Sequence, residues 1–180
     1  MTTANKITIL RVLLVPFFIY FIYNIDKPFF DIISASLFIL ISLTDFLDGY
    51  IARKYNQITT FGKFMDPLAD KILVTSALIM LTQLGKFSGI IAVIIITREF
   101  LVSAIRQLAA ADGTVLAAAW SGKVKTTFQM IGIVAIIIEK YLDMVFPLPY
   151  GEFFSVIMLI LTVYSGGEYL IKNRKLISFK

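Results

Sequence analysis

The chain has 180 residues, of which 58% are hydrophobic, and 17 Lys and Arg against 12 Asp and Glu give a formal net charge of +5. Soluble globular domains are less apolar, so this composition predicts an integral membrane protein. The absence of Cys and His excludes thiolate nucleophiles, Cys-ligated zinc and histidine acid–base chemistry. The positive charge suits anionic lipids and phosphorylated substrates; no nucleic-acid partner is expected, because no basic stripe lies on a soluble domain.

Six apolar segments are long enough to cross a bilayer as helices. They run over about residues 7–23, 30–53, 63–84, 90–111, 121–141 and 153–171. Pro16 should kink the first helix, and Asp31 can cap the second. The third is expected to begin between residues 63 and 67, with Asp66 as its cap and Pro67 in its first turn. The predicted fold class is all-α integral membrane, with six transmembrane helices in a single domain over residues 1–180.

An even number of spans places both termini on one side of the membrane. Most of the positive charge falls on that side, at Lys6, Arg11, Arg53, Lys54, Lys63, Lys123, Lys125 and the basic C-terminal cluster. The other side holds only Lys27, Lys86 and Lys140. The positive-inside rule therefore predicts a multi-pass protein of the cell membrane with both termini cytoplasmic. The first segment ends in bulky aromatic residues rather than a small-residue cleavage site, so we expect it to be retained.

Four aspartates lie between the apolar parts of the second and third segments. Asp45 and Asp48 are three residues apart, and Asp66 and Asp70 are four apart, so each pair shares one face of a helix. Burying charge in hydrocarbon is costly, which favours a function for such a cluster. Oxygen ligands alone suit Mg²⁺ or Mn²⁺, as one or two ions. The alternative is that these acids cap helices or pair with Arg53, Lys54, Lys63 and Lys71.

Polar and small residues also mark the first two helices. Asn5, Thr8 and Arg11 share one side of the first helix, either as a snorkelling anchor or as part of a site. Gly49 and Ala52 lie on or beside the face of the first acidic pair. Small residues there would let a ligand approach the helix backbone closely.

The fourth and fifth segments carry a set of four cations. Arg98 and Arg106 lie about two turns apart on one side of a helix and need a partner, a cavity or a ligand. One alternative is an internal pair between Arg98 and Glu99, although adjacent helix residues point in different directions. Lys123 and Lys125 open the fifth segment, where positive-inside anchors are also expected. Because Arg forks match phosphate oxygens, the set favours a ligand that carries a phosphate group.

The acidic segment as a whole follows the pattern D-x2-D-G-x2-A-R-x8-G-x3-D-x3-D. Its fixed positions are Asp45, Asp48, Gly49, Ala52, Arg53, Gly62, Asp66 and Asp70. In this pattern the chain resembles the CDP-alcohol phosphotransferases. The resemblance implies an enzyme that transfers a phosphatidyl-type group from a CDP-linked donor to an alcohol and releases CMP.

The resemblance also implies roles for particular residues. Asp45, Asp48 and Asp66 would hold the metal with Asp70 beside them, and Asp70 would be the general base. The residues implied for the CDP-lipid donor are Asn5, Thr8, Arg11, Asp48, Gly49, Ala52, Arg53 and Gly62. The phosphate of the acceptor would contact Arg98, Arg106, Lys123 and Lys125.

Three further segments resemble the bacterial family members that use glycerol phosphate: Asn5-x2-Thr8-x2-Arg11, Thr97-Arg98-Glu99-Phe100 and Gly122-Lys123-Val124-Lys125-Thr126. The implied substrates are CDP-diacylglycerol and sn-glycerol 3-phosphate, with membrane lipids around a homodimer. Near the C-terminus, Glu168-Tyr169 stands where this group would have Asp-Tyr. Alternatives are a member with another acceptor (serine, inositol phosphate or phosphatidylglycerol), an intramembrane prenyltransferase and an ion-coupled transporter.

Overall fold

The computed structural model describes the backbone of residues 3–54, 60–111, 116 and 119–174, and the side chains of residues 6–44, 68–69, 71–110, 116 and 119–174. The described ranges form helices without a strand. In chain order these are α1 (Thr3–Tyr23), α2 (Phe30–Lys54), α3 (Thr60–Gln83), α4 (Gly89–Ala111), α5 (Trp120–Ile137), α6 (Glu139–Leu142) and α7 (Tyr150–Lys172). The prediction of an all-helical fold is confirmed.

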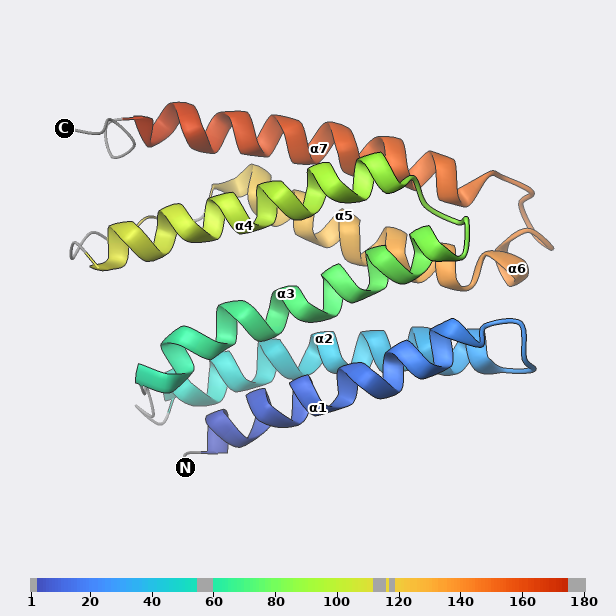
Figure 1. Ribbon diagram of the computed structural model, residues 1–180, viewed down its shortest axis with the longest axis horizontal. Coiled ribbons are helices and arrows are strands. Elements are labelled where there is room, and N and C mark those ends of the chain that lie inside the picture. Colours follow the sequence, from blue (N-terminus) through green and yellow to red (C-terminus); the bar gives the residue numbers. More distant parts are fainter. Residues whose placement is uncertain (1–2, 55–59, 112–115, 117–118, 175–180) are drawn as a thin grey trace.

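The long helices run side by side along the length of the molecule (Figure 1). The start of α1, the ends of α2 and α4, the starts of α3 and α5, and the end of α7 lie at one end, which we call the motif end. The turns between α1 and α2 and between α3 and α4, together with α6, lie at the other end. Within the bundle, α1 packs against α2 and α3, α5 packs against α7, and α4 contacts both α3 and α7.

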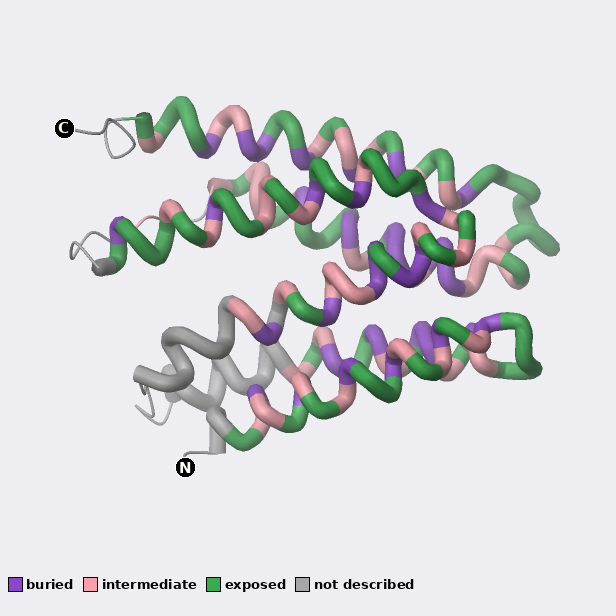
Figure 2. The backbone as a smooth tube through the Cα atoms, in the orientation of Figure 1, coloured by how far each residue is buried: buried purple, intermediate pink, exposed green. Residues whose placement is uncertain are grey.

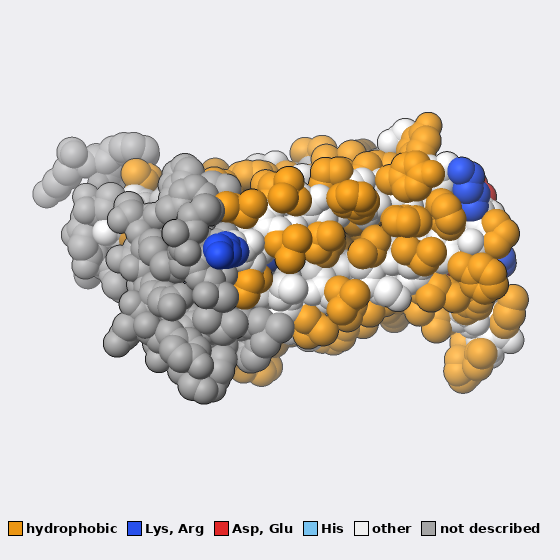
Figure 3. Space-filling view, turned by 90° about the horizontal axis from the view of Figure 1, so that it is seen from below, with side chains coloured by type: hydrophobic (Ala, Val, Ile, Leu, Met, Phe, Trp, Pro, Cys, Tyr) orange, Lys and Arg blue, Asp and Glu red, His pale blue; other side chains and the backbone are white. Residues whose placement is uncertain are grey.

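The exterior of the bundle is more apolar than that of a soluble protein, and several polar residues are buried within it. Large apolar side chains such as Leu13, Leu40 and Ile160 are exposed, and Figure 3 shows apolar side chains along one face with Lys and Arg side chains toward the ends. Polar residues lie inside, including Arg11 and Lys125, each 1% exposed. Figure 2 shows the exposed and buried positions alternating around each long helix. Such an exterior suits contact with lipid acyl chains.

Length and composition mark two helices of the described part of the chain as able to cross a membrane. These are α1, over Lys6–Tyr23, and α7, over Tyr150–Lys172. Shorter apolar stretches lie within α2 (Phe30–Thr44) and α3 (Lys71–Gln83). The core between the helices is apolar and includes Phe18, Phe38, Leu78 and Ile136, all at most 1% exposed.

Two predicted helix boundaries are wrong. Helix α3 begins at Thr60, so Asp66 is not its cap and Pro67 is not in its first turn. Helix α5 ends at Ile137 and the short α6 follows, where one helix to about residue 141 was expected. Residues of α6 contact other parts of the bundle. Glu139 pairs with Lys86 at 3.1 Å, and the Tyr141 hydroxyl donates to Asp31 Oδ1 at 3.4 Å.

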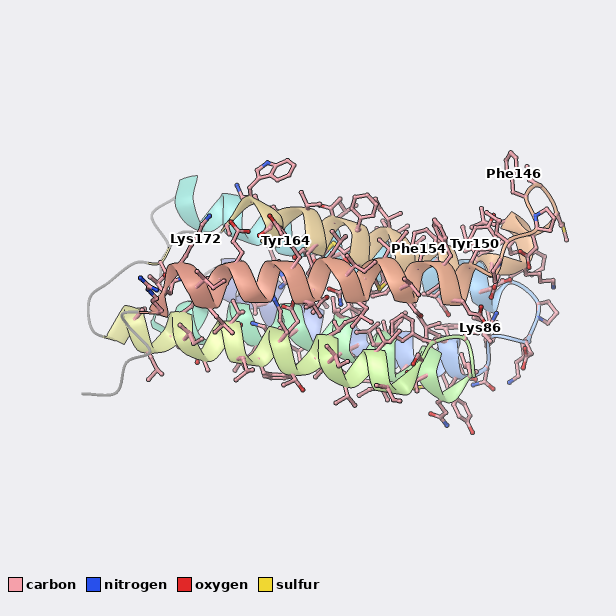
Figure 4. All side chains as sticks on the ribbon, turned by 90° about the horizontal axis from the view of Figure 1, so that it is seen from above. Lys86, Phe146, Tyr150, Phe154, Tyr164 and Lys172 are labelled. Atoms are coloured by element: carbon pink, nitrogen blue, oxygen red, sulfur yellow. The ribbon has the colours of Figure 1, made fainter. Side chains whose placement is uncertain are left out.

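The turn between α3 and α4 is held against the start of α7. Gly85 has φ +70°, a conformation that glycine adopts without strain. A Cβ atom at Gly151 would lie 2.3 Å from the carbonyl oxygen of Lys86, so only glycine permits this approach. Figure 4 shows Lys86 at the same end of the bundle as Tyr150 and Phe154.

We predict that Gly151→Ala destabilises the protein by about 1–3 kcal/mol, because its new methyl group would overlap a backbone atom that cannot rotate away. The measurement is thermal unfolding of the purified protein in detergent. Gly167→Ala in the same helix is the control, since the described part of the chain has no atom within 4 Å of a Cβ there. Equal unfolding midpoints for the two variants would contradict the packing described.

Candidate active site

The acidic motif lies on two neighbouring helices at the motif end. The last turns of α2 carry Asp45 and Asp48, and α3 carries Asp66 and Asp70. These helices are in contact, and they meet at the motif end in Figure 1. Both pairs therefore have the helical spacing that places their members on one face. The structure does not describe the side chains of these four aspartates. The other predicted site residues whose surroundings it does not describe are Asn5, Gly49, Ala52, Arg53 and Gly62.

Helix α1 brings two of the predicted site residues into the bundle. Thr8 and Arg11 are each 1% exposed, on the helix that packs against both α2 and α3. The burial of Arg11 rules out the snorkelling anchor, in which its side chain would extend along the surface. An arginine enclosed at this position is expected to serve a ligand or a buried counter-charge.

A polar cluster joins α4, α5 and α7, and we call it the interhelical cluster: Arg98, Glu99, Lys125, Gln129 and Ser165. The guanidinium of Arg98 donates from Nη1 to Glu99 Oε1 at 3.1 Å and from Nη2 to Ser165 Oγ at 3.0 Å. Lys125 Nζ donates to the same Glu99 Oε1 and to the carboxamide oxygen of Gln129. Two of the four predicted acceptor-site cations, Arg98 and Lys125, are thus linked through one carboxylate.

The internal pair between Arg98 and Glu99 does form, contrary to the argument from helix directions. Their Cα–Cβ bonds diverge, but both side chains are long enough for the terminal groups to meet at 3.1 Å. The pair is one part of a larger arrangement, because each member also contacts another helix.

Small residues make room for Arg98. A Cβ atom at Gly166 would lie 3.2 Å from Arg98 Cγ, and one at Gly122 would lie 4.0 Å from Arg98 Nη2. The side chain therefore occupies a slot between α5 and α7. Gly166 of α7 thus packs closely against Arg98, while Ser165 contributes a hydrogen bond that the sequence did not indicate.

The other two cations of the predicted set lie at the surface. Arg106 is exposed, and its guanidinium carbon lies 5.5 Å from the centre of the Tyr169 ring, a distance at which a cation–π interaction is favourable. Lys123 is exposed as well. The structure therefore divides the set into a linked pair, with Lys125 buried and Arg98 partly buried, and two surface residues.

A small cavity lies beside the cluster, between α3, α4 and α5. Its lining includes Lys71, Thr75, Glu99, Thr126 and Gln129, and about 30 Å³ is open to the centre of a water molecule, enough for one or two waters. Gln129 Nε2 is buried with no hydrogen-bond partner among the described residues. Lys71, which lines the cavity, directly follows Asp70 of the acidic motif in α3.

Two apolar grooves open on the sides of the bundle. One, of about 490 Å³, lies between α2 and α5 and is lined by Phe38, Leu43 and Ile131 among others. The other, of about 340 Å³, lies between α4 and α7, with Arg98 and Gly166 in its lining. Their mostly apolar lining suits acyl chains.

Comparison with known proteins identifies the class to which this helical bundle belongs. Residues 1–165 match the family model described as CDP-alcohol phosphatidyltransferase, and the chain is a member of that family. It is 38% identical to the CDP-diacylglycerol–glycerol-3-phosphate 3-phosphatidyltransferase of Bacillus subtilis, over 94% of this chain and 93% of the relative. Enzymes with the same name from Rickettsia bellii and Haemophilus influenzae are 39% and 38% identical, over 95% and 91% of this chain and 94% and 89% of the relatives.

We predict that Lys125→Met destabilises the fold and that Lys123→Met does not. Removing the buried Lys125 ammonium leaves Glu99 with Arg98 as its remaining partner, and the loss of a hydrogen bond to a charged group costs about 1.5–3 kcal/mol. Lys123 is exposed two residues away, so its replacement should change stability by less than about 0.5 kcal/mol. Chemical denaturation in detergent checks the difference; similar stability losses in both variants would argue against the buried contacts of Lys125.

Proposed function

We propose that this protein transfers the phosphatidyl group of CDP-diacylglycerol to sn-glycerol 3-phosphate, giving phosphatidylglycerophosphate and CMP. The observation that carries the proposal is the complete eight-position acidic motif on the adjoining ends of α2 and α3. It occurs in a chain that is 38–39% identical, over 94–95% of its length, to enzymes named for this reaction.

Asp45, Asp48 and Asp66, with Asp70 beside them, hold one or two Mg²⁺ or Mn²⁺ ions. The donor set fits such ions, because all four ligands are carboxylates on helices that meet at one end of the bundle and hard divalent cations prefer oxygen. When bound, the ions supply positive charge that stabilises the pyrophosphate and the departing CMP.

The donor nucleotide lies against the small residues Gly49, Ala52 and Gly62, which let it approach the helix backbone. Arg53, Asn5, Thr8 and Arg11 complete its surroundings. The burial of Thr8 and Arg11 on a helix packed against both motif helices supports this assignment. The lipid tails lie in the apolar grooves on the sides of the bundle.

The acceptor phosphate binds to the cations Arg98 and Lys125, with Arg106 and Lys123 on its outer side. An acceptor hydroxyl attacks the phosphorus that carries the diacylglycerol group, and the bond from that phosphorus to the CMP oxygen breaks. Asp70 accepts the hydroxyl proton as general base. The cationic set favours an acceptor phosphate over a neutral alcohol, since Arg donors match phosphate oxygens.

In the membrane, α1, α2, α3, α4, α5 and α7 each span the bilayer, and the motif end faces the cytoplasm. The exposed apolar exterior and the excess of Lys and Arg at the motif end support this orientation. The protein acts as a homodimer in the cell membrane, as the family resemblance implies.

We expect the purified protein in detergent, with Mg²⁺ and CDP-diacylglycerol, to release CMP when glycerol 3-phosphate is added. Serine, inositol phosphate and no acceptor serve as controls. Chelation of the metal with EDTA and Asp70→Asn should each lower the rate at least about 100-fold, the scale expected for loss of acid–base catalysis. Release with a different acceptor would replace the substrate proposed here, and a folded, metal-supplied protein that releases no CMP would refute the transferase function.

We expect single cysteines to report the orientation directly, because the chain has no Cys to remove. Lys140→Cys in α6 and Arg174→Cys after α7 replace exposed residues near opposite ends of the bundle. A membrane-impermeant maleimide added to intact cells should label only the first, and both after permeabilisation. The reverse pattern would place the motif end outside the cell.

A further inference from the structure

Glu99 links the two inner cations of the proposed acceptor site, the buried Lys125 and the partly buried Arg98. We infer that Glu99 is a positioning residue: it sets Arg98 and Lys125 side by side as a preformed phosphate-binding pair without touching the acceptor itself. This inference rests on the proposed function and adds a residue that the cationic pattern alone did not indicate.

The geometry of one oxygen atom carries the inference. Oε1 of Glu99 accepts from Arg98 Nη1 at 3.1 Å and also from Lys125 Nζ. Arg98 belongs to α4 and Lys125 to α5, so this atom links cations from two helices. Two like charges enclosed at such short range repel each other strongly when the surroundings are poor in water. The carboxylate between them offsets that repulsion and keeps both cations in place when no phosphate is bound.

The contacts of Arg98 leave donors available for a ligand. A guanidinium has five N–H donors, and the described hydrogen bonds use one on Nη1 and one on Nη2. Arg98 Nε is buried with no hydrogen-bond partner among the described residues. Arg98, Glu99 and Lys125 together carry a net charge of +1, so the group still attracts an anion. Arg98 is therefore fixed in orientation and remains able to donate to a phosphate.

Each of the two linked cations also has a second hydrogen-bond partner. Ser165 of α7 accepts from Arg98, and Gln129 accepts from Lys125 one helical turn along α5. Glu99 also lines the small cavity that has room for one or two waters, together with Lys71, so its carboxylate can stay hydrated there. These features favour an ionised Glu99 that is fixed between two partners.

A second ion pair in the molecule provides a matched comparison. Lys86 and Glu139 are also 3.1 Å apart, and the Glu139 side chain is 21% exposed against 23% for Glu99. Glu139 pairs with one cation at the end of the bundle remote from the motif, whereas Glu99 accepts from two. Glu139→Gln therefore removes a similar ion pair that has no part in the proposed site.

The test is steady-state CMP release by wild type, Glu99→Gln, Glu99→Asp and Glu139→Gln, with either substrate varied. For Glu99→Gln we expect KM for glycerol 3-phosphate to rise about 10-fold or more, on the scale of hydrogen bonds to charged groups. The KM for CDP-diacylglycerol and kcat should each stay within about threefold of wild type, the pattern for loss of uniform acceptor binding. Glu139→Gln should leave all three parameters unchanged.

An unchanged acceptor KM in folded Glu99→Gln would overturn the inference, as would equal effects of Glu99→Gln and Glu139→Gln. If Glu99→Gln does not fold, Glu99→Asp decides, because it keeps the charge on a side chain one methylene shorter. A raised acceptor KM in Glu99→Asp supports the positioning role, and a wild-type KM refutes it. Absence of glycerol 3-phosphate-dependent release by the wild type would instead refute the proposed function, so the two failures are distinguishable.

Discussion

The cost of placing charge among hydrocarbon groups governs this structure. The exterior is apolar, so every charged residue within the bundle must find a compensating group inside it. Lys125 meets that requirement through Glu99 and Gln129, and Arg98 through Glu99 and Ser165. The contacts that satisfy these charges also join α4, α5 and α7. The same contacts therefore compensate the charges and hold the three helices together.

The two halves of the proposed site lie on different sets of helices. The acidic motif belongs to α2 and α3, and the interhelical cluster belongs to α4, α5 and α7. Lys71 bridges the sets: it follows Asp70 in α3, lines the cavity beside Glu99, and donates to the Ser103 hydroxyl of α4. This arrangement suits a reaction between two substrates, because each half can bind its own partner and the contact between α3 and α4 brings the halves together.

The sequence predicted those features that depend on residues close together in the chain. Apolar length predicted the long helices, and fixed spacing predicted which aspartates share a helix face. The boundary of α5 could not be predicted, because it depends on the contact of Glu139 with Lys86, far away in the chain. Ser165 was missed for the same reason: only packing brings α7 to Arg98. The contact of Gln129 with Lys125 could have been predicted from the sequence, since the two residues are four apart, the spacing at which helical side chains meet.

The adjacency of Arg98 and Glu99 has a consequence for how the chain is made. In the proposed membrane arrangement, α4 enters the bilayer before α5 and α7 have been synthesised. An arginine without a nearby counter-charge would stay unpaired in the bilayer until a later helix was inserted, and an unpaired charge among lipid chains is costly in free energy. Because the counter-charge of Arg98 is the next residue and their terminal groups reach each other, Arg98 and Glu99 enter as an electrically neutral pair. Lys125 and Ser165 then join a pair that already exists.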